Sequence, residues 1–181
     1  MTHNIFFILT FIILPSFLFG QFETNKHIAG PSVGFSFLGS TPQVGINHEY
    51  GIALEELGIE EDGKLGLGGV IRYWNYSETF TNVDRDYSDF LLGLQFNYHF
   101  YMSNDYVDPW VGLVLAYNFG SSSTKIKTVG FNISSDNNSG IWLGINAGAK
   151  YWFQKNMAVG IRIGFGTLSY GALDLGFDYK F

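Results

Sequence analysis

The sequence predicts an all-β protein and, within that class, an eight-stranded antiparallel up-and-down transmembrane β-barrel. Three observations support this prediction. Apolar and polar residues alternate with a period of two over most of the 181-residue chain, which is typical of strands whose two faces meet different surroundings. The chain contains 23 glycines, nearly twice the usual share. It ends in "ALDLGFDYKF", where apolar residues alternate with glycine and charged residues and the last residue is aromatic.

The predicted strands are eight alternating stretches, each long enough to cross a bilayer when tilted. In residues 157–166, "MAVGIRIGFG", Val159 and Ile161 face one way while Arg162 and the glycines face the other. After residue 26 the sequence shows no convincing helix. The eight stretches are residues 27–38, 42–54, 64–76, 87–100, 108–120, 139–153, 156–167 and 170–181.

The two faces of these strands differ in a way that favours a membrane barrel. One face carries large aliphatic and aromatic side chains, and the other carries glycines, amides and a few charges. A soluble sandwich exposes Lys, Glu, Thr and Ser instead. Glycine suits the crowded interior of a narrow barrel, and strands in hydrocarbon must close because every backbone group needs a partner there. A soluble lipocalin-like carrier is the alternative, but it would leave the terminal Phe181 without an explanation.

The first twenty residues are predicted to be a secretory signal peptide. Residues 5–19, "IFFILTFIILPSFLF", are apolar apart from three positions, and this length suits a signal-peptide core better than a membrane-spanning helix. We expect cleavage near Gly20–Gln21, with an N-terminal membrane anchor as the alternative. The chain then consists of a signal peptide, 1–20, and an outer-membrane β-barrel domain, 21–181.

The connections between strands predict which end of the barrel faces outward. With both termini in the periplasm, the long connections 77–86 and 121–138 lie outside the cell and the tightest turn, Gln154–Lys155, lies in the periplasm, as is usual for outer-membrane barrels. The acidic segment 55–63 is interpreted as a solvated turn and not as a calcium site, because its carboxylates lack the spacing of a known calcium loop. The triplet 84–86, Asp-Arg-Asp, is interpreted as a solvated loop tip in preference to a cation or partner site.

Composition argues against several classes of function. The chain has no cysteine, so disulfides, thiol catalysis and a lipoprotein anchor are excluded. Its net charge is −6, and no cluster of Lys and Arg offsets this charge, so a nucleic-acid partner is not expected. No motif indicates a cofactor or a metal, and none is expected.

Aromatic residues recur in the tripeptides Tyr-His-Phe, Tyr-Asn-Phe, Tyr-Trp-Phe and Tyr-Lys-Phe. The outer two residues of each share the apolar face at the end of a predicted strand. A tyrosine there keeps its ring in lipid and its hydroxyl among the headgroups, which predicts an aromatic girdle. The girdle residues are Tyr98, Phe100, Tyr117, Phe119, Tyr151 and Phe153, with Tyr87 and Phe90 expected beside Phe119 at the outer interface.

Three segments, 89–100, 108–120 and 142–166, together with the C-terminal strand, resemble the small eight-stranded outer-membrane β-barrels of Gram-negative bacteria, the OmpA/OmpX-like type. The resemblance covers nearly all of residues 27–181 and implies a porin-like fold in the outer membrane. It also implies two partners, the lipid bilayer and the barrel-assembly machinery. The resemblance further implies that the machinery reads an assembly signal made of Leu175, Phe177, Tyr179 and Phe181.

Charged residues on the polar face are expected to lie in the lumen and to form an ion-pair network. An unpaired charge in so narrow an interior costs several kcal/mol, so the near balance of acids and bases suggests pairing. We expect Glu49 to pair with Arg72, and Arg162 with Asp174 or Asp178. A packed plug is favoured over a gate whose pairs switch. The predicted network comprises Glu49, Arg72, Lys150, Arg162, Asp174 and Asp178, with Lys180 as a further lumen candidate.

The histidines do not suggest an active site. His27 and His99 are expected near the periplasmic end, and His48 is expected on the lipid side with Glu49 facing the other way. None is predicted to form a catalytic dyad near the outer rim, so the protein is not expected to be an enzyme.

These expectations lead to two hypotheses of function. The first is a non-enzymatic barrel that supports the membrane and presents its two long outer loops, with the external ligand left open. The alternative is a narrow pore for ions or small solutes, gated by the lumen ion pairs.

Overall fold

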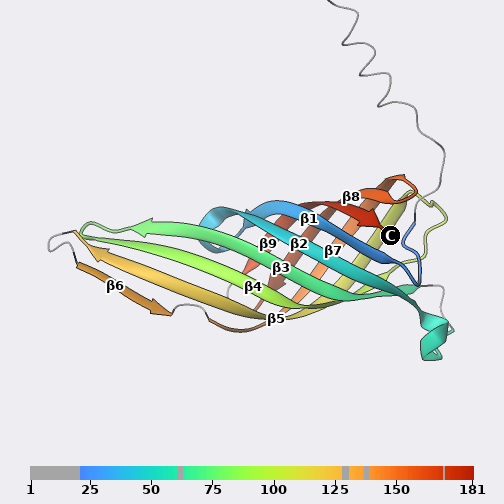
Figure 1. Ribbon diagram of the computed structural model, residues 1–181, viewed down its shortest axis with the longest axis horizontal. Helices are drawn as coiled ribbons and strands as arrows, with labels where there is room; N and C mark the ends of the chain where they lie inside the picture. Colours follow the sequence, from blue (N-terminus) through green and yellow to red (C-terminus); the bar gives the residue numbers. More distant parts are fainter. Residues whose placement is uncertain (1–20, 61–62, 128–130, 137–138, 169) are drawn as a thin grey trace, which may run out of the picture.

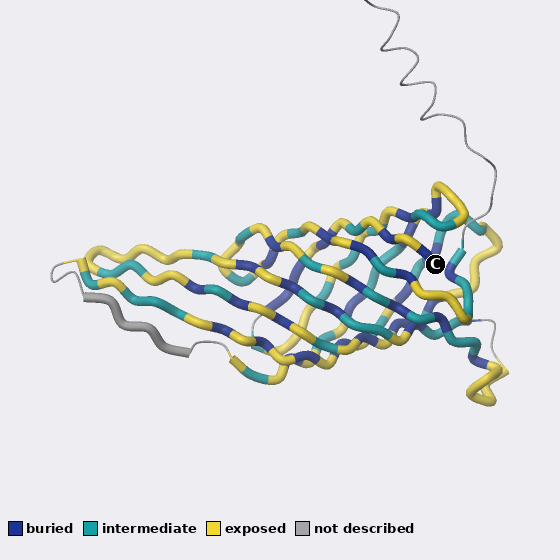
Figure 2. The backbone as a smooth tube through the Cα atoms, viewed as in Figure 1, coloured by how far each residue is buried: buried dark blue, intermediate teal, exposed yellow. Residues whose placement is uncertain are grey.

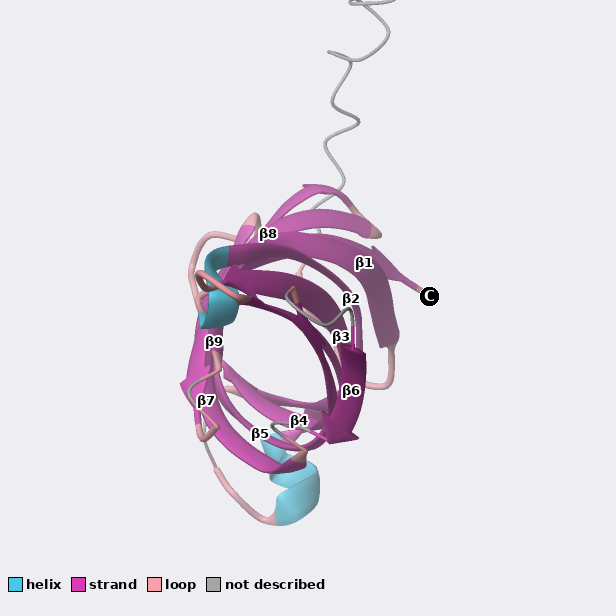
Figure 3. Cartoon of the chain, turned by 90° about the vertical axis from the view of Figure 1, so that its left-hand side faces the viewer, coloured by secondary structure: helices cyan, strands magenta, loops and turns pink. Residues whose placement is uncertain are grey.

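Eight antiparallel strands close into a barrel, which confirms the predicted fold class. In the wall β1 pairs with β2, β2 with β3, β3 with β4, β4 with β5, β5 with β7, β7 with β8, β8 with β9, and β9 again with β1 (Figures 1 and 3). The strands are β1 (His27–Ser36), β2 (Thr41–Ala53), β3 (Lys64–Thr79), β4 (Val83–His99), β5 (Val107–Ile126), β6 (Phe131–Asp136), β7 (Gly140–Gln154), β8 (Met157–Gly166) and β9 (Gly171–Lys180).

The computed structural model describes residues 21–60, 63–127, 131–136, 139–168 and 170–181. The predicted signal peptide lies outside these residues. Two short 3-10 helices, η1 (Leu38–Ser40) and η2 (Leu54–Leu57), follow β1 and β2. Within the described residues, no helix has the length and apolar character needed to cross a membrane.

The two predicted outer loops are largely strand, so that part of the prediction is wrong. β3 continues to Thr79, β4 begins at Val83 and β5 continues to Ile126. Beyond the barrel these three strands form a sheet with β6, whose one pairing among the described residues is with the far end of β5 (Figure 1). The polar sequence looked like loop, but neighbouring strands satisfy its backbone groups: Asp86 faces both Ser77 and Ser123 in the strand register. The triplet 84–86 accordingly lies in β4 and is not a loop tip.

The connections at the opposite end of the barrel vary in length, with ten residues after β2, seven after β4 and two after β7. β7 and β8 are joined through Lys155 and Asn156, one residue later than predicted, with an irregularity in the pairing between Trp152 and Gln154. The acidic segment 55–63 begins in η2, and residues 61–62 within it lie outside the described part of the chain. Among the described residues there is no group of three or more His, Cys, Asp or Glu side chains that could hold a metal ion.

The outer wall of the barrel is apolar and its interior is packed with polar and aromatic groups. Buried and exposed positions alternate along the strands of the wall (Figure 2). Leu113 and Ile145 are 61% and 62% exposed, whereas Gln95 and Asn97 are fully buried. This inverts the pattern of a soluble protein, because apolar side chains line the surface that would otherwise meet water. A hydrocarbon environment explains the inversion, because lipid solvates the apolar outer wall. The backbone N–H and C=O groups need no water there, since strand pairing around the closed barrel satisfies them.

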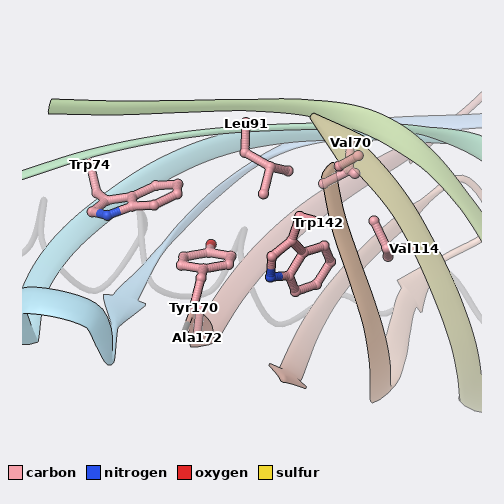
Figure 4. Packing of buried hydrophobic residues seen from close by; sticks show 8 residues of the cluster. Val70, Trp74, Leu91, Val114, Trp142, Tyr170 and Ala172 are labelled. Atoms are coloured by element: carbon pink, nitrogen blue, oxygen red, sulfur yellow. The ribbon is translucent and has the colours of Figure 1, made fainter. Parts of the chain in front are cut away.

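The interior has three layers, of which only the middle one was predicted. The outer layer is an aromatic cluster around Trp74, Trp142 and Tyr170 (Figure 4). The middle layer carries the charges. The third layer, at the end of the barrel where β1 begins and β9 ends, which is predicted to face the periplasm, consists of Phe22, Ile28, Trp152 and Ala158.

Candidate functional site

The charged layer of the lumen is the candidate site, and Lys150 lies at its centre. Lys150 projects from β7 and Glu49 from β2, on the far side of the barrel. The Lys150 ammonium lies 3.2 Å from Glu49 Oε1 and 3.3 Å from Asp178 Oδ2. All three side chains are buried, so these ion pairs are shielded from water and from salt. One ammonium therefore links β2, β7 and β9 across the lumen.

Arg72 forms a second group of contacts, and it corrects the predicted pairing. Its guanidinium lies 2.9 Å from Asp174 Oδ2 and donates to Asn47 Oδ1 at 2.7 Å. Gln43 also donates to Asp174. The predicted Glu49–Arg72 pair does not form, because Arg72 lies opposite Gly45 in the β2–β3 register. Four residues separate Gly45 from Glu49 along β2, which is about 13 Å of strand.

Arg162 lies between these two groups and binds amides more closely than acids. Its Nη1 donates to Asn47 Oδ1 at 2.6 Å and to Gln95 Oε1 at 3.1 Å. The guanidinium lies 4.7 Å from the centre of the Trp110 ring, and Nη2 is 3.9 Å from Glu49. No ion pair joins Arg162 to Asp174 or Asp178 within 4.0 Å, although Asp174 is its direct partner in the β8–β9 register. The predicted pairing of Arg162 is therefore wrong.

His99 belongs to the same network, and the sequence reasoning missed it. Its Nε2 lies 2.9 Å from Glu49 Oε2 and its Nδ1 lies 2.7 Å from Asp108 Oδ1. The signal was present, because His99 follows Gln95 and Asn97 on the polar face of its strand. The prediction concerned a catalytic dyad near the outer rim, whereas His99 and its two carboxylate partners lie at the opposite end of β4. The imidazole is 2% exposed, both nitrogens are occupied, and the Phe22 ring stacks on it at 3.6 Å.

The segment before β1 closes the lumen at the end of the barrel where β1 begins. Phe22 is 1% exposed. Lys64 donates to the carbonyl oxygen of Phe22 at 2.6 Å, and Lys180 donates to that of Gln21 at 2.9 Å. Lys180 also pairs with Glu23 at 2.6 Å. These bonds hold the segment in place, so the base of the barrel is sealed by the chain's own residues.

The aromatic cluster closes the outer part of the lumen. Tyr170 stacks on Trp74 at 4.3 Å between ring centres and meets Trp142 edge-on at 5.6 Å (Figure 4). The Tyr170 hydroxyl donates to Gln43 at 2.7 Å, which ties the cluster to the charged layer. The cavity between the two layers measures about 40 Å³, which is room for only a few water molecules.

The predicted girdle and assembly residues lie on the outer wall. Tyr87 is the exception: it faces inward and stacks on Tyr76 at 4.5 Å. Tyr117 and Phe119 are not at a strand end, because β5 continues to Ile126. Tyr98, Phe100, Tyr151 and Phe153 lie at the C-terminal ends of β4 and β7. Leu175, Phe177, Tyr179 and Phe181 project outward from and just beyond β9.

The sheet beyond the barrel carries a groove of about 730 Å³ on its outward face. Small polar side chains, including Ser77, Asp86 and Ser123, line it directly above the apolar wall. Asp84 pairs with Lys127 at 3.0 Å, and the hydrogen bond from that ammonium lowers the pKa of the carboxyl. The stacked rings of Tyr76 and Tyr87 also line this groove.

Comparisons with solved structures show the same fold at low sequence identity. The chain is similar to Ail, the attachment invasion locus protein of Yersinia pestis, with a TM-score of 0.55 and 14% identity over 88% of this chain and 100% of that one. It is also similar to the N-terminal β-barrel domain of Pseudomonas aeruginosa OprF, with a TM-score of 0.54 and 16% identity over 87% and 98%. A designed transmembrane β-barrel is similar with a TM-score of 0.52 and 16% identity, over 89% of this chain and 99% of that one.

No curated protein matches the chain. A family model described as "Opacity family porin protein" matches residues 67–175, which is more than half of the sequence. Together with the closed barrel and its apolar wall, this match confirms the predicted location in the outer membrane. The protein belongs to the Opacity porin family of outer-membrane β-barrels.

Proposed function

We propose that this protein is a non-enzymatic, non-conducting barrel that anchors a β-sheet above the outer membrane. The observation that carries this proposal is the filled lumen. An eight-stranded barrel has an interior only just wide enough for side chains, and here three successive layers occupy it. A continuous path for ions would have to pass both the Tyr170 cluster and the Phe22 plug.

The outer sheet is the part of the molecule that can meet a partner. It projects beyond the barrel (Figure 1), and its groove of about 730 Å³ is far larger than the lumen cavity of about 40 Å³. The groove is lined by hydroxyl, amide and carboxyl groups, which suit hydrogen bonding to a polar partner. The role of the barrel would then be to hold this surface at a fixed height above the lipid.

A narrow pore is the second candidate, and the unpaired polar atoms of the lumen favour it. Among the described residues, both amide atoms of Asn97, Ser32 Oγ and Asn146 Oδ1 are buried without a partner. Buried polar groups of this kind are normally satisfied by water. A lumen that already holds water could conduct if its two seals moved aside.

Planar-bilayer recording distinguishes the two candidates. We expect the refolded wild-type chain to give no discrete openings, and Phe22→Ala or Tyr170→Ala alone to stay silent because the other seal remains. The double variant Phe22→Ala/Tyr170→Ala should open small steps. Phe100→Ala, on the outer wall, is the control for loss of an aromatic ring. Openings in the wild-type chain would instead establish a pore.

We also propose that the assembly machinery reads the alternating residues of β9 and the terminal Phe181. Phe181 lies at the seam where β9 meets β1, and its backbone exchanges hydrogen bonds with His27 at 3.1 and 2.9 Å. We expect Phe181→Ala to reduce the amount of folded protein in the outer membrane several-fold while leaving refolding in detergent unchanged. The control is Phe165→Ala, on the outer wall of β8. Equal loss in both variants would mean that no special signal exists at the C-terminus.

A further inference from the structure

Two histidines face each other on the outer surface of the barrel, away from the lumen. His27 begins β1 and His48 lies in β2, where the register pairs His27 with Tyr50 and His48 with Ala29. The two histidines therefore occupy diagonal positions on one face of adjacent strands. Their rings stack at 5.3 Å, and His27 Nδ1 lies 3.0 Å from His48 Nε2.

We propose that this pair binds a divalent transition-metal ion such as Zn²⁺. Imidazole nitrogens bind Zn²⁺ at about 2.0–2.1 Å. Two such bonds at an angle of 90–110° place the nitrogens about 2.9–3.4 Å apart. The observed nitrogens are 3.0 Å apart and point at each other along the line between the ring centres, so each ring must turn to aim its nitrogen at a shared ion. Without a metal, one of the two nitrogens donates a hydrogen bond to the other, and the tautomers decide which one is the donor. Imidazole ligands select ions such as Zn²⁺, Cu²⁺ and Ni²⁺ over Mg²⁺ and Ca²⁺.

The surroundings hold the two imidazoles beside each other before any ion arrives, so only the rings have to turn. The backbone N–H and C=O of His27 both bond to Phe181, at 3.1 and 2.9 Å. The His27 ring also packs against Tyr50 at 4.9 Å, and the Tyr50 hydroxyl donates to Asn25 at 2.8 Å. Ligands on paired strands lose little freedom on binding, which favours a preorganised site.

Because the His27–His48 pair is partly exposed, a bound ion would have only two ligands from the protein and the rest from its surroundings. His27 is exposed and His48 is half-buried, so water or lipid phosphate can complete the coordination. The described residues offer no third His, Cys, Asp or Glu to this pair, so we expect weaker binding than at a three-ligand zinc site. Because the backbone of His27 pairs with Phe181, a bound ion would also strengthen the seam that closes the barrel.

Calorimetric titration with ZnCl₂ tests the proposal on untagged chain refolded from Gln21 onward. We expect one ion per chain, at least tenfold weaker binding in both His27→Gln and His48→Gln, and no binding of Mg²⁺. Tyr50→Phe keeps the neighbouring ring and is the matched control, so it should bind as the wild type does. Zinc should also raise the thermal unfolding midpoint of the wild type and of Tyr50→Phe only.

Two results would overturn the metal site. The first is the absence of any heat of binding up to millimolar zinc in a chain shown to be folded by its heat-modifiable gel mobility. The second is binding by both histidine variants that equals binding by the wild type, which would place the zinc elsewhere.

Discussion

Glu49→Ala is expected to lower the free energy of unfolding by about 3–5 kcal/mol, the usual cost of removing one partner from a buried ion pair. Glu49 is 1% exposed, and its carboxylate oxygens lie 3.2 Å from Lys150 Nζ and 2.9 Å from His99 Nε2. Its loss leaves Lys150 with Asp178 alone and gives the layer an uncompensated positive charge. Urea unfolding of the barrel in lipid vesicles, followed by tryptophan fluorescence, measures the change.

Three further variants separate the charge from other effects. Glu55→Ala removes an exposed carboxylate in η2 and should change stability by less than about 1 kcal/mol. Glu49→Gln keeps the shape and should still destabilise the barrel. Adding Lys150→Met and Asp178→Asn to Glu49→Gln should recover much of the loss, because replacing all three members of this buried group is far less costly than removing one. A loss in Glu49→Ala no larger than in Glu55→Ala would mean that the network contributes little.

The fold could be predicted because the alternation of residues reports the face of each strand directly. In β8, for example, Val159 and Ile161 alternate with Gly160 and Arg162, and this remains true wherever the strand lies in the barrel. The alternation of apolar and polar residues stops where the strands leave the lipid. Ser121 and Ser123 continue the outer face of β5, but above the lipid that face is polar, so the strand is no longer visible in the sequence.

The charged layer could be predicted only in part, for a related reason. Alternation shows that Glu49 and Lys150 face inward, but not at what height each one lies. Height depends on the stagger between strands that are distant in sequence, and these two residues are 101 positions apart. His99 was overlooked because it lies between Tyr98 and Phe100, whose girdle pattern dominated the interpretation of that segment. Trp74 and Trp142 were missed because large aromatic residues were assigned to the lipid face.

Two adjacent glycines in β3 provide the other large expected effect. Gly68 faces the lumen and Gly69 faces outward, so one substitution can be compared with the same substitution one residue away. At Gly68 an added Cβ would overlap the carbonyl oxygen of His48 and lie 2.7 Å from Glu49 Cα. At Gly69 the nearest atom to an added Cβ is the carbonyl oxygen of Gly93, at 3.6 Å, which is ordinary contact.

Gly68→Val is therefore expected to destabilise the barrel by about 3 kcal/mol, the upper part of the range for overpacking, and to reduce the refolded fraction on a heat-modifiability gel. Gly69→Val should leave stability equal or slightly higher, because a β-branched residue suits a strand and adds apolar surface facing lipid. The loss at Gly68 has a definite cause, since the β2 backbone beside Glu49 would have to move outward and stretch the contacts to Lys150 and His99. If both valine variants refold equally well, the interior must be looser than the contacts around Gly68 indicate, and the case for a sealed lumen would weaken with it.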